Sequence, residues 1–212
     1  MSADTYKTIK SPSEGYFIDK RSKFYAFAYS VETEDEIKEH LSALKKQYYD
    51  ARHHVYAWIL GADKTHYRTN DDGEPSGSSA KPIYGQLLSN DLTNIVIVVV
   101  RYFGGVKLGV PGLINAYRTA AQDAIQNAEI IEKTVEDCFE LRYDYLLMNE
   151  VMKILKEEPV AIVEQEFDNQ CKIIFCIRRC HSDKIKTHLE QVSGVMVNKI
   201  NFLSLQPKFI TQ

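Results

Sequence analysis

The chain has 212 residues, of which 44% are hydrophobic and 26% charged, with only 6 prolines and 10 glycines. This composition excludes a disordered or fibrous protein, and the length suffices for two modest domains that each bury a core. A formal net charge of -3 and an isoelectric point near 6.1 exclude a protein that coats nucleic acid through its bulk charge. Any contact with nucleic acid therefore has to be local.

Hydrophobic periodicity predicts a mixture of strands and helices in the first 133 residues. Residues 14–31 alternate unevenly between apolar and polar side chains, which predicts two short strands joined near Lys20 to Ser22. Thr33 and Glu36 form a capping box that begins a helix ending near Tyr48. There follow a strand (53–60), a long polar loop (61–80), a short helix (81–89), a buried strand (95–100) and a long helix from Pro111 to Ala128.

The pattern changes from residue 134 onwards. It predicts a strand (134–145), a helix (146–157), two strands (160–167 and 171–180), a helix (181–192) and a strand (195–205). That order is βαββαβ, the ferredoxin-like arrangement. We therefore expect an α+β protein with two domains, residues 1–133 and 134–212.

The start of the chain and its cysteines indicate the compartment. The residues up to Phe17 contain no apolar signal region, and no apolar run approaches the roughly 20 residues of a membrane-spanning helix. We expect a cytoplasmic protein without a membrane partner, in which Cys138, Cys171, Cys176 and Cys180 are reduced thiols in the core. Cys171 and Cys176 would face opposite sides of one strand, which disfavours a shared zinc ion.

A glycine-rich loop joins the buried strand to the long helix. Gly104, Gly105 and Gly109 permit backbone conformations that other residues avoid, and a helix N-terminus offers unpaired N–H groups with about half a positive charge. The charges between residues 76 and 117 are Lys81, Arg101 and Lys107 against Asp91 alone. These features favour a phosphate site, and a tight turn flanked by solvated cations is the alternative interpretation.

This loop matches no nucleotide-binding motif. Val110 and Pro111 stand where a P-loop requires Lys and then Ser or Thr, and the loop contains no GxGxxG pattern. ATP or GTP hydrolysis and dinucleotide binding are therefore unsupported, and we expect no cofactor.

A second motif in the polar loop reads DDGEPS. The carboxylates of Asp71, Asp72 and Glu74 have the chemistry of Mg²⁺ ligands or of an acid and base. Glycine and proline among acidic residues more often form a solvated turn, in which the carboxylates can pair with Arg101 or Lys107. We expect neither a metal nor a catalytic residue here. The role stays open for Asp71, Asp72, Gly73, Glu74, Pro75 and Ser76.

The DDGEPS motif and the segment VRYFGGVKLGVPGL, residues 100–113, resemble the signature of the IMPACT family, also called the YigZ family. The family pattern is roughly DGEP, Ser or Pro, Gly, Thr, Ala, Gly, Pro in the first motif, and RYFGG, any residue, KLG, any residue, GGL, any residue, RAY in the second. This sequence departs from the family pattern at Ser78, Ser79, Ala80, Pro111 and Asn115. Because Asn115 replaces an arginine, one cation that could bind phosphate is missing.

The resemblance spans the whole chain and implies a fold. Bacterial members join an N-terminal βα domain, which resembles the second domain of a small-subunit ribosomal protein, to a ferredoxin-like C-terminal domain. The two domains resemble domains four and five of elongation factor G, which implies contact with RNA or the ribosome. Eukaryotic relatives carry an extra N-terminal domain and regulate an amino-acid-starvation kinase by competing for its activator protein. That domain is absent here, so we do not expect this role to transfer.

Three functions follow as hypotheses. The favoured one is a non-enzymatic module that binds nucleic acid or the ribosome and is linked to translation regulation. Its predicted contacts are Arg101, Tyr102, Gly104, Gly105, Lys107 and Gly109. The alternatives are a metal-assisted enzyme that uses the DDGEPS carboxylates on a phosphorylated or peptide substrate, and a regulator that binds a protein partner.

Overall fold

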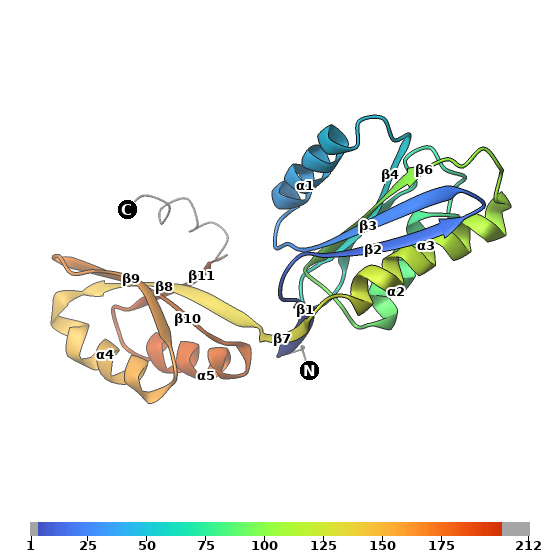
Figure 1. Cartoon of the computed structure of the whole chain (residues 1–212). Helices are drawn as coiled ribbons and strands as arrows, with labels where there is room; N and C mark the ends of the chain where they lie inside the picture. Colours follow the sequence, from blue (N-terminus) through green and yellow to red (C-terminus); the bar gives the residue numbers. More distant parts are fainter. Residues whose placement is uncertain (1–3, 201–212) are drawn as a thin grey trace. The chain divides into compact units, whose positions relative to one another are not determined.

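The computed structural model describes residues 4–200, and the chain divides into two compact units, Met1–Lys133 and Thr134–Gln212. Each unit combines helices with antiparallel strands (Figure 1), so the expected α+β fold is confirmed. Within residues 4–200, no helix is long and apolar enough to cross a membrane.

The first unit is built on a five-stranded sheet. In chain order its elements are β1 (Thr5–Ile9), β2 (Ser13–Asp19), β3 (Ser22–Ser30), α1 (Glu34–Gln47), β4 (His53–Leu60), β5 (His66–Asn70), α2 (Ala80–Ser89), β6 (Ile95–Tyr102), α3 (Gly109–Gln126) and β7 (Ile130–Thr134). The strand order in the sheet is β2-β3-β6-β4-β5, with every neighbouring pair antiparallel. Strands β1 and β7 form a separate two-stranded sheet.

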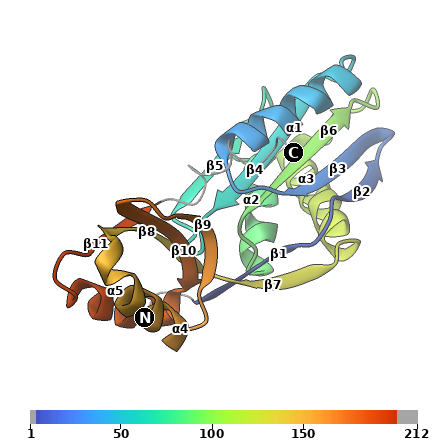
Figure 2. The same ribbon diagram turned by 90° about the vertical axis from the view of Figure 1, so that its left-hand side faces the viewer.

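Strand β6 lies at the centre of the five-stranded sheet because its side chains are apolar on both faces. The residues Ile95 to Val100 are 0% exposed. One set of alternating side chains packs against α2 and α3, and the other set packs against α1, so helices cover both faces (Figure 2). The double-sided burial predicted from the aliphatic run is thus observed.

Three short strands of this unit, β1, β5 and β7, were not predicted from the sequence. Strand β5 lies inside the segment expected to be a polar loop, and its residues His66 to Asn70 are exposed or half-buried, so they carry no apolar alternation. Strand β1 pairs with β7 rather than with the main sheet. Short edge strands are held by their neighbours, which a local pattern does not reveal.

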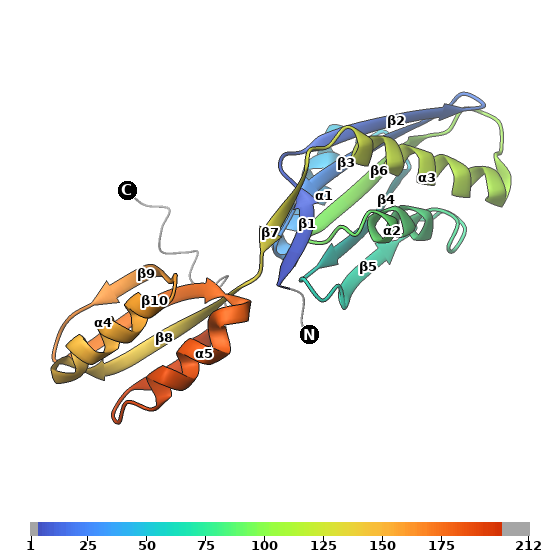
Figure 3. The ribbon, with the colours of Figure 1, turned by 90° about the horizontal axis from the view of Figure 1, so that it is seen from below.

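The second unit is a four-stranded antiparallel sheet with two helices on one face (Figure 3). Its elements are β8 (Glu136–Asp144), a 3-10 turn (Tyr145–Leu147), α4 (Met148–Glu157), β9 (Ala161–Glu166), β10 (Gln170–Arg178), α5 (Arg179–Glu190) and β11 (Met196–Ile200). The strand order β11-β8-β10-β9 follows the predicted ferredoxin-like arrangement. The last five residues of the final predicted strand, 201–205, lie outside the described residues.

The cysteines of the second unit correct an expectation. Cys138 of β8 and Cys176 of β10 stand directly opposite each other in the strand register, with their Cα atoms 4.1 Å apart, and form a disulfide. Cys171 and Cys180 form no disulfide, and of these Cys171 is buried but Cys180 is exposed. The expectation of four core thiols was therefore wrong, because strand register, which pairs distant residues, is not visible in cysteine spacing.

This pairing predicts a thiol count. Protein purified in air and then unfolded should react with two equivalents of a thiol reagent, from Cys171 and Cys180, and with four after reduction. Because the bond closes a loop with a sequence separation of 38 residues, its reduction should lower the unfolding free energy of the second unit by at most about 4 kcal/mol. The variant Cys138→Ala/Cys176→Ala should give two thiols in both conditions, and four thiols in unreduced natural protein would contradict the bond.

Candidate functional site

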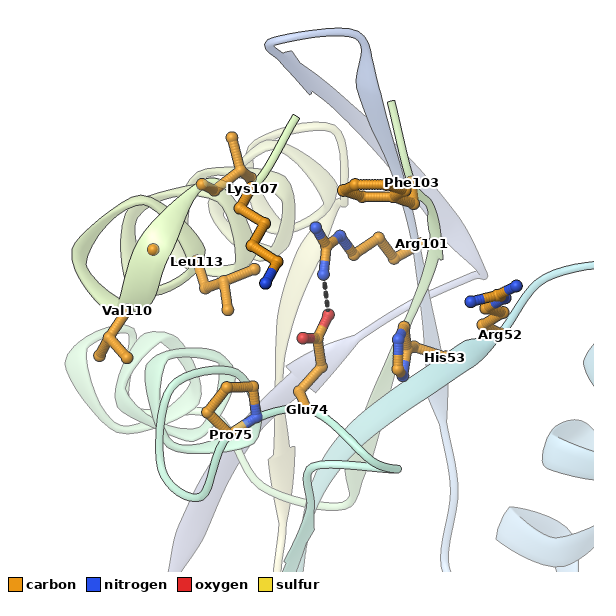
Figure 4. Close-up of a pocket in the computed structure, with 11 residues that line it drawn as sticks. Arg52, His53, Glu74, Pro75, Arg101, Phe103, Lys107, Val110 and Leu113 are labelled. Atoms are coloured by element: carbon orange, nitrogen blue, oxygen red, sulfur yellow. Dashed lines mark hydrogen bonds and ion pairs between the residues drawn. The ribbon is translucent and has the colours of Figure 1, made fainter. Parts of the chain in front are cut away.

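The first unit contains a pocket of about 450 Å³ at the end of the sheet where β4 begins and β6 ends. His53 and Arg101 lie opposite each other in the register of these strands and continue the alternation of the core residues Val55 and Val99. Both side chains therefore point to the side of the sheet that α2 and α3 cover. We call this cavity the Arg101 pocket; its lining comprises Arg52, His53, Glu74, Pro75, Arg101, Phe103, Lys107, Leu108, Gly109, Val110 and Leu113 (Figure 4).

A buried ion pair forms the wall of the pocket. Arg101 Nη1 donates to Glu74 Oε1 at 2.5 Å, and the two side chains are only 8% and 4% exposed (Figure 4). Tyr117 of α3 also donates to Glu74 Oε1, at 2.8 Å. Burial, and then the Glu74 carboxylate, raises the pKa of Tyr117, so its hydroxyl remains a donor. The positive charge of Arg101 is thus already neutralised by the protein.

The DDGEPS motif holds Glu74 in this position. Asp71 accepts hydrogen bonds from the backbone N–H groups of Gly77, Ser79 and Ala80 and from the Ser79 hydroxyl, which fixes the start of α2. Burial by itself would raise the pKa of Asp71, but these hydrogen bonds outweigh it and hold the pKa below its ordinary value. The Asp71 carboxylate is therefore an acceptor for the loop rather than an open ligand.

The next residues of the motif tie the loop to β4. Asp72 Oδ2 accepts from the backbone N–H of His54 at 2.6 Å, and the Asp72 carbonyl lies 2.8 Å from His53 Nδ1. Gly73 has a φ of +86°, which turns the chain so that Glu74 enters the pocket. Pro75 lines the pocket and Ser76 is exposed. The motif therefore fixes the loop through Asp71 and Asp72 and places one carboxylate, that of Glu74, in the pocket.

Within residues 4–200, no group of three or more His, Cys, Asp or Glu side chains is arranged to hold a metal ion. Asp71 and Asp72 accept backbone hydrogen bonds, and Glu74 is paired with Arg101. The three carboxylates on which the metal-assisted hypothesis relied thus have separate protein partners, and nothing in their arrangement favours it.

The glycine loop divides into parts with different tasks. A Cβ atom on Gly104 would lie 2.1 Å from the backbone carbon of Arg21, so glycine is required where the loop meets the β2–β3 turn. Gly105 and Gly109 have φ values of +88° and +72°, and Gly109, the first residue of α3, lines the pocket. Of the predicted glycines, only Gly109 therefore reaches the pocket.

Tyr102 is not brought to the pocket. It follows Arg101 along β6 and so points to the opposite face, where its hydroxyl donates to Asp50 Oδ1 at 2.6 Å. That hydrogen bond, followed by burial, raises the pKa of Tyr102 to about 12. This hydrogen bond ties β6 to the segment after α1. Strand alternation alone could have indicated that Tyr102 points away from Arg101.

The residues of the pocket lining that were not predicted as site residues are Arg52, His53, Phe103, Leu108, Val110 and Leu113. Two of them, Arg52 and Phe103, present an exposed charge and an exposed ring. Arg52 precedes β4, and Phe103 follows β6 with 54% of its surface exposed. The Arg101 guanidinium carbon lies 5.7 Å from the centre of the Phe103 ring. Phe103 belongs to the RYFGG motif, and an aromatic residue beside two glycines is a signal that could have identified it. Arg52, in contrast, becomes a neighbour of the pocket only through the pairing of β4 with β6.

The open charges of the pocket are positive. Arg52 and Lys107 are exposed, and neither forms an ion pair or a side-chain hydrogen bond with any residue that the structure describes. The N-terminal residues Gly109 and Val110 of α3 add the positive end of a helix dipole. An anionic group is the ligand that this combination stabilises.

The buried pair predicts strong coupling between its two residues. Glu74→Leu or Arg101→Met alone should destabilise the first unit by about 3 to 5 kcal/mol, because the remaining charge stays buried without a partner. The double variant should be more stable than the sum of both losses implies. Denaturant unfolding followed through Trp58, which is buried in this unit, measures the cycle. Additive losses would contradict the coupling, and Tyr102→Phe on the opposite face serves as a control with a small effect.

Comparison with known proteins places this geometry in a family. The sequence model of the Impact N-terminal domain matches residues 20–125, which include both motifs and the whole pocket. IMPACT family member YvyE of Bacillus subtilis is 31% identical over 160 residues, covering 76% of this chain and 74% of that protein. IMPACT family member YigZ of Escherichia coli is 30% identical over 150 residues, covering 70% and 74%.

The fold has a counterpart among solved structures. A crystal structure described only as that of a hypothetical protein superposes with a TM-score of 0.72 at 24% sequence identity. The superposition covers 94% of this chain and 99% of the other, so the likeness extends over both units. With the matched N-terminal domain and relatives similar over most of their length, this chain belongs to the IMPACT family.

Proposed function

We propose that this chain is a non-enzymatic module that binds RNA phosphates in the Arg101 pocket, and that it acts in translation through RNA of the ribosome or bound to it. The observation that carries the proposal is which cations of the pocket are paired with a carboxylate and which are not. Arg101 is neutralised by Glu74, whereas Arg52 and Lys107 have no acidic partner within the described residues. Two open cations beside a helix N-terminus provide a site for one phosphate group.

The exposed ring of Phe103 favours a nucleotide over a simple anion. It lies at the pocket, and aromatic rings stack on unpaired bases of any sequence. The overall charge of -3 suits such a local contact, because it disfavours binding along the rest of the surface. The link to translation rests on the family resemblance, because the likeness of its two domains to domains four and five of elongation factor G implies contact with RNA or the ribosome.

The proposal predicts the salt dependence of RNA binding. Arg52→Gln/Lys107→Gln should weaken the binding of single-stranded ribosomal RNA fragments and reduce the slope of log K against log salt by about 0.7, the contribution of one neutralised phosphate on a single strand. Fluorescence anisotropy over a salt series measures both quantities. Arg101 is left intact because its removal would leave Glu74 buried without a partner.

The matched control removes the same two charges elsewhere in the unit. Lys45→Gln/Lys46→Gln changes exposed residues of α1, which packs on the opposite side of the sheet, and should leave the slope unchanged. Equal slopes in all three proteins would reject the RNA site. If the natural chain bound no RNA fragment at all, a protein partner would become the leading function.

A further inference from the structure

The turn between β2 and β3 carries two cations in a costly conformation. Asp19 pairs with Ser22, so Lys20 and Arg21 form a two-residue hairpin turn, and their φ values are 43° and 66°. Such a turn requires a positive φ at both positions, for which Asn-Gly is the favoured sequence. Long side chains are disfavoured in this region because the Cβ atom crowds the following carbonyl.

Other residues with a positive φ have contacts that account for them. Lys64 and Asp91 pair with each other, the Asp72 carboxylate accepts from His54, and the Asn94 side chain accepts from the Gly61 backbone. In contrast, the side chains of Lys20 and Arg21 are exposed and form no ion pair or hydrogen bond within residues 4–200. No internal contact of these side chains therefore offsets the cost of the turn.

The turn is anchored to the edge of the Arg101 pocket. A Cβ atom on Gly104 would lie 2.1 Å from the backbone carbonyl carbon of Arg21 and 2.5 Å from the backbone carbonyl oxygen of Lys20. The backbones of the turn and of Gly104 are therefore in direct contact. The Gly104 N–H donates to the hydroxyl of Ser22, which is fully buried. Phe103, the neighbour of Gly104 in the chain, lines the pocket. Lys20 and Arg21 are thus held at a fixed place beside Phe103.

We propose that the Lys20–Arg21 turn is a second phosphate contact for a single-stranded RNA whose first phosphate lies between Arg52 and Lys107. This inference rests on the proposed function and names its ligand as a strand of at least two nucleotides. Phe103 lines the pocket and is followed in the chain by Gly104, which contacts the turn, so its exposed ring is available to stack on a base of the same strand. A single strand fits because its bases are free to stack, whereas a duplex keeps them paired.

The most informative variant removes both positive charges and at the same time gives the turn a sequence that suits its backbone conformation. Lys20→Asn/Arg21→Gly introduces the sequence that this turn favours, so the melting temperature of the first unit should stay equal or rise. The affinity for a single-stranded uridine octanucleotide should fall, with a salt slope smaller by about 0.7 for the one lost phosphate contact. Binding of uridine 5′-monophosphate, which reaches only the pocket, should not change. Lys45→Gln/Lys46→Gln is again the charge-matched control.

Two outcomes would overturn the second contact while sparing the proposed function. One is a normal octanucleotide slope in Lys20→Asn/Arg21→Gly together with a reduced slope in Arg52→Gln/Lys107→Gln. The other is equal affinity for a duplex of the same length. Unchanged slopes in both variants would reject the pocket and the turn together. If the Asn-Gly variant melted at a lower temperature, Lys20→Gln/Arg21→Gln would replace it under the same criteria.

Discussion

The buried ion pair between Glu74 and Arg101 is the constraint on which the open end of the first unit depends. Glu74 comes from a polar loop and Arg101 lies near the end of the central strand. Their pairing holds the loop against the sheet at the point where the apolar run of β6 ends. Because both groups are almost fully buried, each requires the other, and Tyr117 binds the same carboxylate oxygen from α3. One carboxylate thereby joins loop, strand and helix, and this junction sets the shape of the pocket.

Much of this fold could be predicted from local pattern. The aliphatic run from Ile95 marked the central strand, and Thr33 with Glu36 marked the start of α1, where the Thr33 hydroxyl does accept from the Glu36 N–H. These signals are strong because they depend on neighbours in the chain. The βαββαβ order of the second unit followed from the same kind of periodicity. Strands β1, β5 and β7 and the Cys138–Cys176 pair depend on partners distant in sequence, which is why the sequence did not predict them.

For the candidate site, the sequence indicated several of the residues that line the pocket but not which contacts each of them makes. Glycine, arginine and lysine in one segment indicated an anion site, and the acidic motif was correctly seen as a candidate partner for Arg101. The sequence did not distinguish a cation engaged inside the protein from one open to a ligand. That difference follows from the fold, because Asp71 and Asp72 fix the loop that holds Glu74 beside Arg101, and Arg52 becomes a neighbour only through β4.

Residues with a positive φ at the edge of the pocket fall into two kinds, those whose side chains gain a contact within the protein and those whose side chains do not. Where a residue adopts an unfavourable backbone conformation and gains a contact, as Asp72 does with His54, the fold itself explains it. Lys20 and Arg21 adopt such conformations, yet their side chains gain no contact within residues 4–200. Natural proteins depart from local preference chiefly where function demands it. Since these two cations adjoin Phe103 at the edge of the pocket, an external anion is the partner that would compensate for the unfavourable turn.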